Sequence, residues 1–159
     1  MVTLKFITIG SLKEGYLKSA VQEYEKRLSG FGKIINVNLK EVRISPSPSA
    51  SEIKASLSEE GKAILGNMSD RSYNIALCVE GKQFSSEELA ETLESVCLRT
   101  NEICFIIGSS HGLSDEVKNA ADLKLSLSKL TFPHQLMRVI LLETVYRSMS
   151  IIKGTKYHK

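Results

Sequence analysis

Apolar and polar residues change period along the chain, and the changes predict strands and helices in turn. Residues 2–9 are mainly β-branched and apolar, and they predict a strand that stops at Gly10. Over residues 13–29 the apolar positions recur at spacings of three and four, which predicts a helix that ends at Gly30. Residues 34–44 alternate apolar and polar positions, as expected of a strand with one face in water.

The rest of the chain continues this order of strands and helices. A loop rich in serine and proline at 45–49 is followed by a predicted helix that Ser49 or Ser51 can cap and that ends near Leu65. Further predicted elements are apolar strands at 75–79 and 103–107, an alternating LKLSLS segment at 123–128, and helices from Ser85 to Cys97, near 114–121, and from Pro133 to Met149. Strands that are apolar throughout are typical of sheets covered on both faces. The pattern therefore predicts one α/β domain over residues 1–159, with a mainly parallel sheet flanked by helices.

Composition agrees with a single globular domain. The chain has 159 residues, of which 42% are hydrophobic and 25% charged, and these values exclude a disordered chain, a fibre and a coiled-coil rod. No apolar run approaches the roughly 18 residues of a membrane span, and the N-terminus does not resemble a signal peptide. The three cysteines form no CxxC pair, and we expect free thiols in a reducing cytoplasm.

Positive charge is concentrated in the last fifth of the chain. Residues 129–159 contain six Lys or Arg side chains against one acid, Glu143, although the whole chain carries only +3. A polyanion such as nucleic acid can bind at such an end, but a basic terminus is also often only solvated. The tail, Lys153 to Lys159, adds Tyr157 and His158 to these cations, and this combination suits phosphate contact and base stacking. A frayed terminus is the alternative interpretation.

Two segments are candidates for ligand contact. Residues 108–112, GSSHG, follow a buried strand, and ligands of open α/β sheets bind beyond the carboxyl ends of the strands. Their spacing matches neither a dinucleotide-binding fingerprint nor a P-loop, and a plain turn is the alternative. The second segment runs from Leu127 to His134, where Pro133 fixes the start of the last helix. Its serine, threonine and backbone groups can hold a polar ligand, or they can simply connect two elements.

The last predicted helix is apolar around almost its whole circumference. One sheet face covers only one side of a helix, so a second helix or a second subunit must cover the rest, and a homodimer is the simplest solution. The apolar residues concerned are Leu136, Met137, Val139, Ile140, Leu141, Leu142, Val145, Tyr146 and Met149.

Other common sites are absent from the sequence pattern. His111, His134 and His158 are not spaced as metal ligands, and no cysteine stands near enough to suggest a zinc site, so we expect no metal. A GxSxG nucleophile elbow is also missing. Cys78, Cys97 and Cys104 lie in apolar patterns and are interpreted as core residues.

Taken together, these residues resemble the ribosomal RNA large subunit methyltransferase H family, a minimal group of the SPOUT methyltransferases. The resemblance covers essentially the full length. It is strongest in LSKLTFPHQLMRVILLETVYRS at 127–148 and in the final Tyr157-His158-Lys159, with further matches in YEKRL at 24–28 and at Gly81-Lys82.

This resemblance implies a SPOUT-type fold with a C-terminal trefoil knot and a homodimer. It further implies that S-adenosylmethionine (SAM) donates a methyl group to ring N3 of a pseudouridine in large-subunit ribosomal RNA of assembled, cytoplasmic ribosomes. The cofactor contacts carried over are Leu77, Gly108, Leu127, Ser128, Lys129, Leu130, Thr131 and Phe132, and the expected RNA contacts are Arg138, Lys156 and Lys159.

The sequence differs from the family pattern at two positions, and alternatives remain open for the catalytic base and for the function. The family usually has a second glycine at the position of Ser109, and it often has an acid at the position of Cys78. Because N3 loses a proton, a base is expected to contribute; His158 is the candidate, Tyr157 a stacking or hydrogen-bonding group, and His134 the rival base. A non-catalytic RNA-binding module and a nucleotide-binding α/β regulatory domain are the alternative functions.

Overall fold

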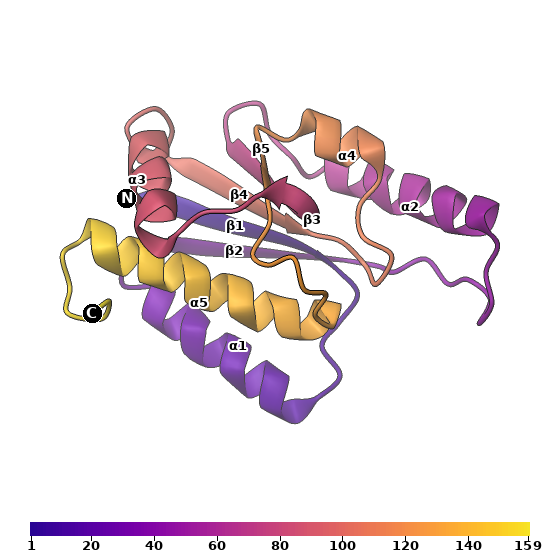
Figure 1. The fold of residues 1–159 in the computed structure, drawn as a ribbon, viewed down its shortest axis with the longest axis horizontal. Helices are drawn as coiled ribbons and strands as arrows, with labels where there is room; N and C mark the ends of the chain where they lie inside the picture. Colours follow the sequence, from indigo (N-terminus) through magenta and orange to yellow (C-terminus); the bar gives the residue numbers. More distant parts are fainter.

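The computed structural model describes all 159 residues and has three layers, with helices on both faces of a five-stranded sheet (Figure 1). Neighbouring strands are parallel, in the order β2-β1-β4-β3-β5, which confirms the predicted α/β class and parallel sheet. The strands are β1 (Val2–Ile9), β2 (Gly32–Leu39), β3 (Tyr73–Lys82), β4 (Glu102–Ile107) and β5 (Leu123–Leu125). The helices are α1 (Gly15–Leu28), α2 (Ala50–Leu65), α3 (Ser86–Cys97), α4 (Asp115–Ala120) and α5 (His134–Ile152).

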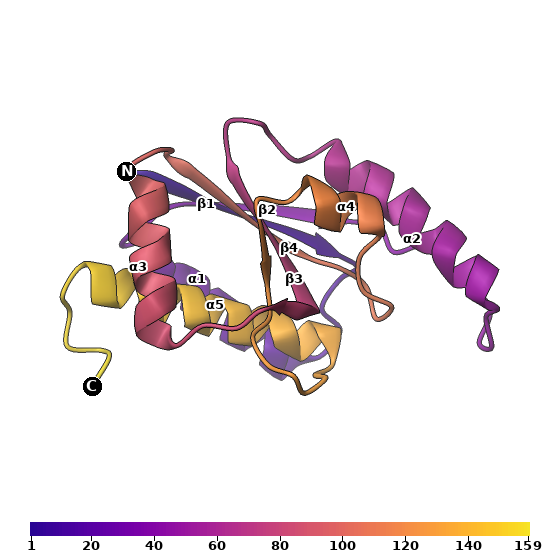
Figure 2. The ribbon, with the colours of Figure 1, turned by 45° about the horizontal axis from the view of Figure 1, so that its top comes forward.

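The sheet is buried on both faces because its central strands carry apolar residues at successive positions. Phe6 of β1 and Phe105 of β4 stack at 5.3 Å between ring centroids, on the face covered by α1, α3 and α5. Ile7 and Ile106, one position further along each strand, pack on the opposite face against α2 and α4. Figure 2 shows these two helix layers on either side of the sheet. No helix is both long and apolar enough to cross a membrane.

Two helices begin at capping boxes that the sequence indicates. The side chain of Ser49 accepts the Glu52 backbone N–H at 3.2 Å, and that of Ser85 accepts the Glu88 N–H at 3.1 Å. Each glutamate side chain reaches back to the backbone N–H of the capping serine. Four backbone N–H groups at every helix start lack a partner within the helix, so these contacts fix where α2 and α3 begin.

The strand expected at 34–44 is shorter in the structure and ends at Leu39. Leu39 pairs with Ile9, the last residue of β1. Gly10 then adopts φ +78° and turns the chain away, so residues beyond Leu39 have no neighbouring strand to bond with. The end of β2 is therefore set by its partner and not by its own alternating pattern.

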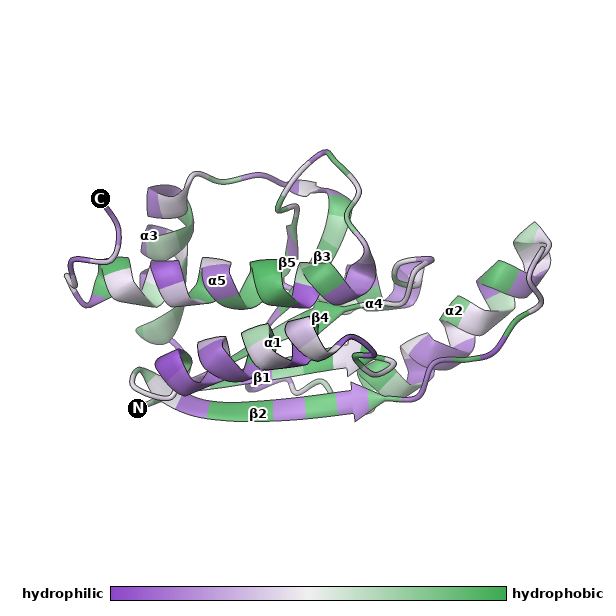
Figure 3. Cartoon of the chain, turned by 90° about the horizontal axis from the view of Figure 1, so that it is seen from below, coloured by the Kyte–Doolittle hydropathy of each residue, from purple (hydrophilic) through white to green (hydrophobic).

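The long apolar helix α5 is covered more completely within one chain than the sequence argument allowed. Figure 3 shows α5 lying between α3 and α1. Leu141, Leu142, Val145 and Met149 are buried against the sheet and these helices. The Tyr146 ring packs edge-on against neighbouring aromatic rings. Leu136, Met137, Val139 and Ile140, in the first turns of α5, are only partly buried, so this end of the helix still offers apolar surface to a second subunit.

At the β3–β5 edge the backbones approach so closely that only glycine fits at position 81. A Cβ atom on Gly81 would lie 2.7 Å from the carbonyl carbon of Lys124. Lys82 pairs with Leu125, and the Ser126 N–H donates to the Lys82 carbonyl oxygen at 2.9 Å. These contacts fix the point from which the segment 127–133 departs.

We predict that Gly81→Ala destabilises the protein. The added methyl group forces the two backbones apart, so the free energy of unfolding should fall by about 1–3 kcal/mol in urea titrations. Gly15→Ala is the matched control, because a Cβ at Gly15 would meet no atom within 4 Å. Equal stability of the two variants would contradict this account of the β3–β5 edge.

Candidate functional site

A cavity of about 490 Å³ opens where the carboxyl ends of β3, β4 and β5 meet the start of α5. This is the edge at which open α/β sheets bind ligands. All the residues that the resemblance assigns to the cofactor line the cavity, except Lys129, whose side chain is exposed to solvent. The lining residues are Leu77, Cys78, Val79, Ile107, Gly108, Ser109, Ser110, Gly112, Leu125, Leu127, Ser128, Leu130, Thr131, Phe132, Pro133, His134 and Met137.

One wall is the tight turn that follows β4. The Gly112 N–H donates to the Ser109 carbonyl oxygen at 2.9 Å, and Gly112 has φ +89°, a conformation that favours glycine. A Cβ on Gly108 would lie 2.1 Å from the Gly112 carbonyl oxygen. Both glycines are therefore required by the turn itself, and the turn brings its backbone to the cavity.

The opposite wall is the segment Leu127–Phe132. It forms no backbone-to-backbone hydrogen bond. Its shape depends on Ser126, whose hydroxyl donates to the Ser128 carbonyl oxygen, and on Ser128, whose hydroxyl accepts the Leu130 N–H, each at 3.0 Å. Pro133 then begins α5 without a side-chain cap. Free backbone groups beside apolar side chains suit a ligand with both polar and apolar parts.

The serine at position 109 is tied to a buried glutamate of α2. The Ser109 hydroxyl donates to Glu60 Oε1 at 2.9 Å, and the Val42 N–H donates to Glu60 Oε2 at 3.1 Å. Ser109 is 7% exposed and Glu60 only 4%. Glu60 thus links the turn after β4 to the loop after β2, a contact that the sequence reasoning missed.

Cys78, the second position at which this sequence differs from the family pattern, lies at the cavity. Glu80, two residues later, turns away from the cavity. Burial, and then the charge of Glu80, raises the pKa of the Cys78 thiol. Glu80 forms an ion pair with Lys118 of α4, and this hydrogen bond lowers the pKa of Glu80. Glu80 therefore does not bring a carboxylate to the cavity beside Cys78.

Arg138 lies inside the protein, although it is assigned to RNA contact by the sequence interpretation. It is 7% exposed, and its guanidinium Nη2 donates to the carbonyl oxygens of Ile9 at 2.7 Å and Gly10 at 2.6 Å. Burial lowers the pKa of Arg138. The guanidinium satisfies the carbonyl groups at the end of β1, whereas Lys156 and Lys159 are exposed.

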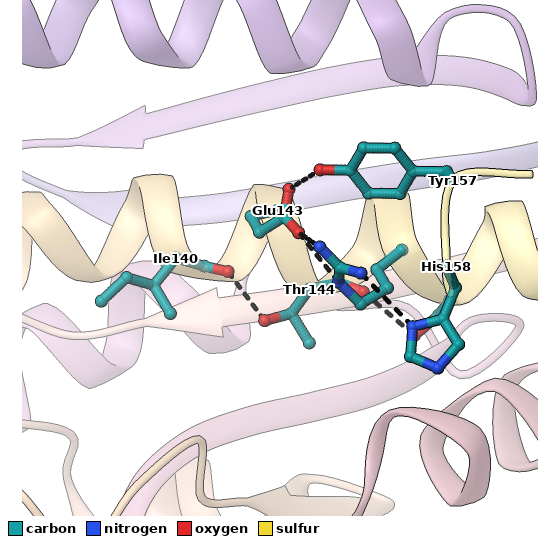
Figure 4. A network of polar contacts seen from close by, with 7 residues as sticks. Ile140, Glu143, Thr144, Tyr157 and His158 are labelled. Carbon is teal, nitrogen blue, oxygen red and sulfur yellow. Dashed lines mark hydrogen bonds and ion pairs between the residues drawn. The ribbon is translucent and has the colours of Figure 1, made fainter.

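The C-terminal tail folds back on α5 and not into the cavity. Tyr157 Oη donates to Glu143 Oε2 at 2.7 Å, and Glu143 Oε1 accepts Arg147 Nη2 at 2.6 Å (Figure 4). The Arg147 guanidinium lies 4.7 Å from the Tyr157 ring centroid and Nη1 lies 3.3 Å from His158 Nδ1. His158 Nε2 lies 2.8 Å from Glu87 Oε1 of α3.

Charge in this tail network is arranged around the Glu143 carboxylate. Burial opposes ionisation of Glu143, but the hydrogen bond from Tyr157 and the cation of Arg147 outweigh it, and the pKa of Glu143 is lowered. The hydrogen bond to Glu143 raises the pKa of Tyr157. Both shifts favour the same pairing, in which an ionised carboxylate accepts a hydrogen bond from a protonated phenol.

The sequence-predicted residues thus form two groups. Leu77, Gly108 and the 127–132 segment meet at the cavity, together with His134, whereas Tyr157 and His158 lie beside the distal half of α5. Glu143 and Arg147 were missed as functional candidates. One signal was available, because Glu143 is the single acid in the basic stretch 129–159. No group of three or more His, Cys, Asp or Glu side chains lies close enough to hold a metal ion.

We predict that Ser109→Ala lowers the free energy of unfolding by about 1–3 kcal/mol, because the buried Glu60 carboxylate loses one of its donors. Ser110→Ala is the control, since Ser110 is exposed and forms no hydrogen bond, and it should leave stability unchanged. Chemical denaturation of the three proteins measures both effects. Indistinguishable curves would show that the contact between Ser109 and Glu60 contributes nothing.

Comparisons with known proteins agree with this geometry. Residues 2–158 match the family model described as predicted SPOUT methyltransferase. The chain is 49% identical over 157 residues to the ribosomal RNA large subunit methyltransferase H of Streptococcus thermophilus, covering 98% of this chain and 99% of the relative. It is 45% identical to that of Clostridioides difficile over 159 residues, covering 99% of this chain and all of the relative.

Solved structures show the same fold at low identity. A methylase family protein from Haemophilus influenzae superposes with a TM-score of 0.54 at 15% identity, covering 98% of this chain and 70% of that protein. A Legionella pneumophila methyltransferase, solved in complex with its bound cofactor SAM, gives a TM-score of 0.50 at 12% identity, covering 95% and 66% of the two chains. From the full-length match to the family model and to close relatives, this chain belongs to the SPOUT methyltransferases, in the ribosomal RNA large subunit methyltransferase H family.

Proposed function

We propose that the chain transfers the methyl group of SAM to ring N3 of a pseudouridine in large-subunit ribosomal RNA, within assembled ribosomes of the cytoplasm. The observation that carries this proposal is the cavity at the carboxyl edge of the sheet, whose walls are the Gly108 turn and the 127–132 segment. The relatives' name supports the RNA substrate. The basic tail supports a polyanionic partner.

The residues at the cavity fit SAM in size and chemistry. The cavity volume of about 490 Å³ lies within the range of roughly 300–1,000 Å³ that holds cofactor-sized ligands. Leu77 and Leu127 offer apolar surface to an adenine ring. The backbone groups of residues 127–132 other than the Ser128 carbonyl and the Leu130 N–H have no hydrogen-bond partner and offer donors and acceptors to polar atoms. Gly108 brings backbone alone to the ligand. When bound, SAM supplies an activated sulfonium methyl group.

The protein's own tasks are alignment and proton removal. The nitrogen nucleophile must approach the methyl carbon from the side opposite the sulfur atom, and orientation of this kind is a large part of catalysis. A positioned base contributes roughly 10²–10⁴-fold. We assign the base to His158 and a stacking or hydrogen-bonding role to Tyr157. His134, which lines the cavity, is the rival base.

We further propose a homodimer, because the tail of one chain is held outside its own cavity. Ile152, the last residue of α5, lies roughly 22 Å along the helix axis from Met137 at the cavity. The tail instead folds back along α5, where Tyr157 bonds to Glu143, and neither Tyr157 nor His158 lines the cavity. In Figure 1 the C-terminus lies beside the end of α5 that is distant from the 126–133 loop. The tail of a second copy is therefore the proposed source of Tyr157 and His158.

The trefoil knot implied by the family resemblance is part of this proposal, and it would be formed by the segments that meet at the β3–β5 edge. There the chain after β5 passes against Gly81 and Lys82, where the backbones touch. In the proposed complex Lys156 and Lys159 bind phosphates, since both are exposed. Arg138, also proposed as an RNA contact, would have to leave the carbonyl groups at the end of β1.

Deletion of residues 156–159 should abolish methyl transfer while leaving SAM affinity and folding unchanged, because the tail does not line the cavity. The assay is transfer of labelled methyl from SAM to intact ribosomes, separate subunits and naked RNA, with mass mapping of the product. Full activity of the truncated protein would remove the tail from the active site and direct attention to His134. A protein that binds RNA but no SAM would be a non-catalytic module, and one that binds ATP or NAD instead would be a regulatory domain.

His158→Ala should lower the single-turnover rate, and the deficit should shrink as pH rises if the imidazole removes the N3 proton. The deficit shrinks at high pH because hydroxide then removes part of the N3 protons in place of the imidazole. The tail network does not confound this profile, since the lowered pKa of Glu143 and the raised pKa of Tyr157 keep that contact intact at neutral and mildly basic pH. A deficit that is constant with pH would remove His158 as the base.

Two inactive variants should restore activity when mixed, if each site uses two chains. One variant lacks residues 156–159, and the other carries Gly108→Val, which blocks the turn at the cavity. Light scattering of the unmodified protein should give about twice the 17.6 kDa chain mass. A monomer with full methyl transfer, or a mixture that stays inactive although subunits exchange, would contradict the shared site.

A further inference from the structure

The acid Glu143 is the centre of the contacts that hold the C-terminal tail. Each carboxylate oxygen has a different partner: Oε2 accepts from Tyr157 at 2.7 Å, and Oε1 accepts from Arg147 Nη2 at 2.6 Å and Nε at 2.9 Å. The side chain is about three-quarters buried, and so its hydrogen bonds are only partly exposed to competing water. Charge-assisted hydrogen bonds of this kind are stronger than neutral ones.

The arginine held by Glu143 determines the state of the imidazole. Arg147 Nη1 lies 3.3 Å from His158 Nδ1, and a guanidinium can only donate, so Nδ1 is the acceptor. In the neutral ring the proton is then on Nε2, which donates to Glu87 Oε1 at 2.8 Å. Glu143 thus acts on His158 through Arg147, and on Tyr157 directly. Both ring nitrogens are occupied in this arrangement, so His158 accepts the N3 proton only once Arg147 no longer donates to Nδ1.

Side chains, and not backbone bonds, give the tail its position. The last backbone-to-backbone hydrogen bond of the chain joins the Thr155 N–H to the Ser150 carbonyl oxygen, and none involves residues 156–159. The Tyr157 ring packs edge-on against Tyr146 at 4.7 Å between centroids. That contact is not directional enough to fix a hydroxyl or an imidazole. The orientation of Tyr157 therefore depends on Glu143, and that of His158 depends on Glu87 and on the Arg147 that Glu143 holds.

We propose that Glu143 is a positioning residue for methyl transfer, which orients Tyr157 and, through Arg147, His158 toward the RNA base. This inference rests on the proposed function. The Glu143 carboxylate does not line the cavity. Its removal leaves the tail attached but free to sample many orientations, and misplacement by about 1 Å can reduce a rate by roughly 10²-fold.

The test is a double-mutant cycle between Glu143→Ala and Tyr157→Phe, measured by single-turnover methyl transfer to ribosomes. We expect Glu143→Ala to lower the maximal rate about 10- to 100-fold, with unchanged affinity for SAM. Glu143→Gln should retain more activity, because the amide oxygen still accepts from Tyr157. In the double variant the loss should be smaller than the product of the two single losses, since both remove the same contact.

Glu91→Ala is the matched control. Glu91 lies on α3, is exposed and forms no hydrogen bond or ion pair, so its removal should leave the rate unchanged. NMR order parameters of residues 155–159 give a readout independent of turnover, and they should be lower in Glu143→Ala than in the unmodified protein and the Glu91 control.

The outcomes separate this inference from the proposed function. If the unmodified protein transfers no methyl group to any RNA, both fail. If the unmodified protein is active, the positioning role alone fails in either of two cases. In the first, Glu143→Ala transfers methyl at the normal rate. In the second, the rate loss of the double variant equals the product of the losses of Glu143→Ala and Tyr157→Phe. A variant that loses SAM binding and cooperative unfolding along with its rate would show that Glu143 serves the fold alone.

Discussion

The close approach of two backbones at the β3–β5 edge is the constraint on which the candidate site depends. Gly81 has no side chain, so Lys82 can pair with Leu125, and its carbonyl oxygen can accept a hydrogen bond from the Ser126 N–H. This contact sets the direction in which the 127–133 segment leaves the sheet. The cavity wall and the start of α5 follow from that direction, because the segment has no backbone bonds of its own to determine its path.

Most of the fold could be predicted from residue patterns because the physical cause was local. Ser85 and Glu88 are close in sequence, and the capping box that they form is visible as a motif. The uniformly apolar β4 indicated a strand buried on both faces. What could not be predicted depended on distant partners. The end of β2 at Leu39 is set by the turn of Gly10, and the burial of α5 is set by α1 and α3.

The residues of the candidate site also divide into those that the sequence could predict and those that depend on distant partners. Gly108 and the 127–132 segment could be assigned to one edge, because parallel strands bring their carboxyl ends together. The contacts of Glu60 with Ser109, and of Glu143 with Tyr157, join residues 49 and 14 positions apart through side chains alone. No spacing rule predicts such pairs. The burial of Arg138 is similar, because a basic residue in a basic stretch gives no sign that it faces two carbonyl groups of β1.

The strand order has a consequence for how the chain acquires its structure during synthesis. The central pair joins β1 to β4, with Leu4 opposite Ile103, so nearly a hundred residues must emerge between the two partners. Until then β1 has only the edge strand β2 beside it, and its apolar side chains lack the helices α3 and α5 that later cover them. Pairings between such distant segments form slowly. The nascent chain therefore exposes an incomplete sheet with uncovered apolar side chains for most of its translation, and such a sheet is prone to associate with other chains.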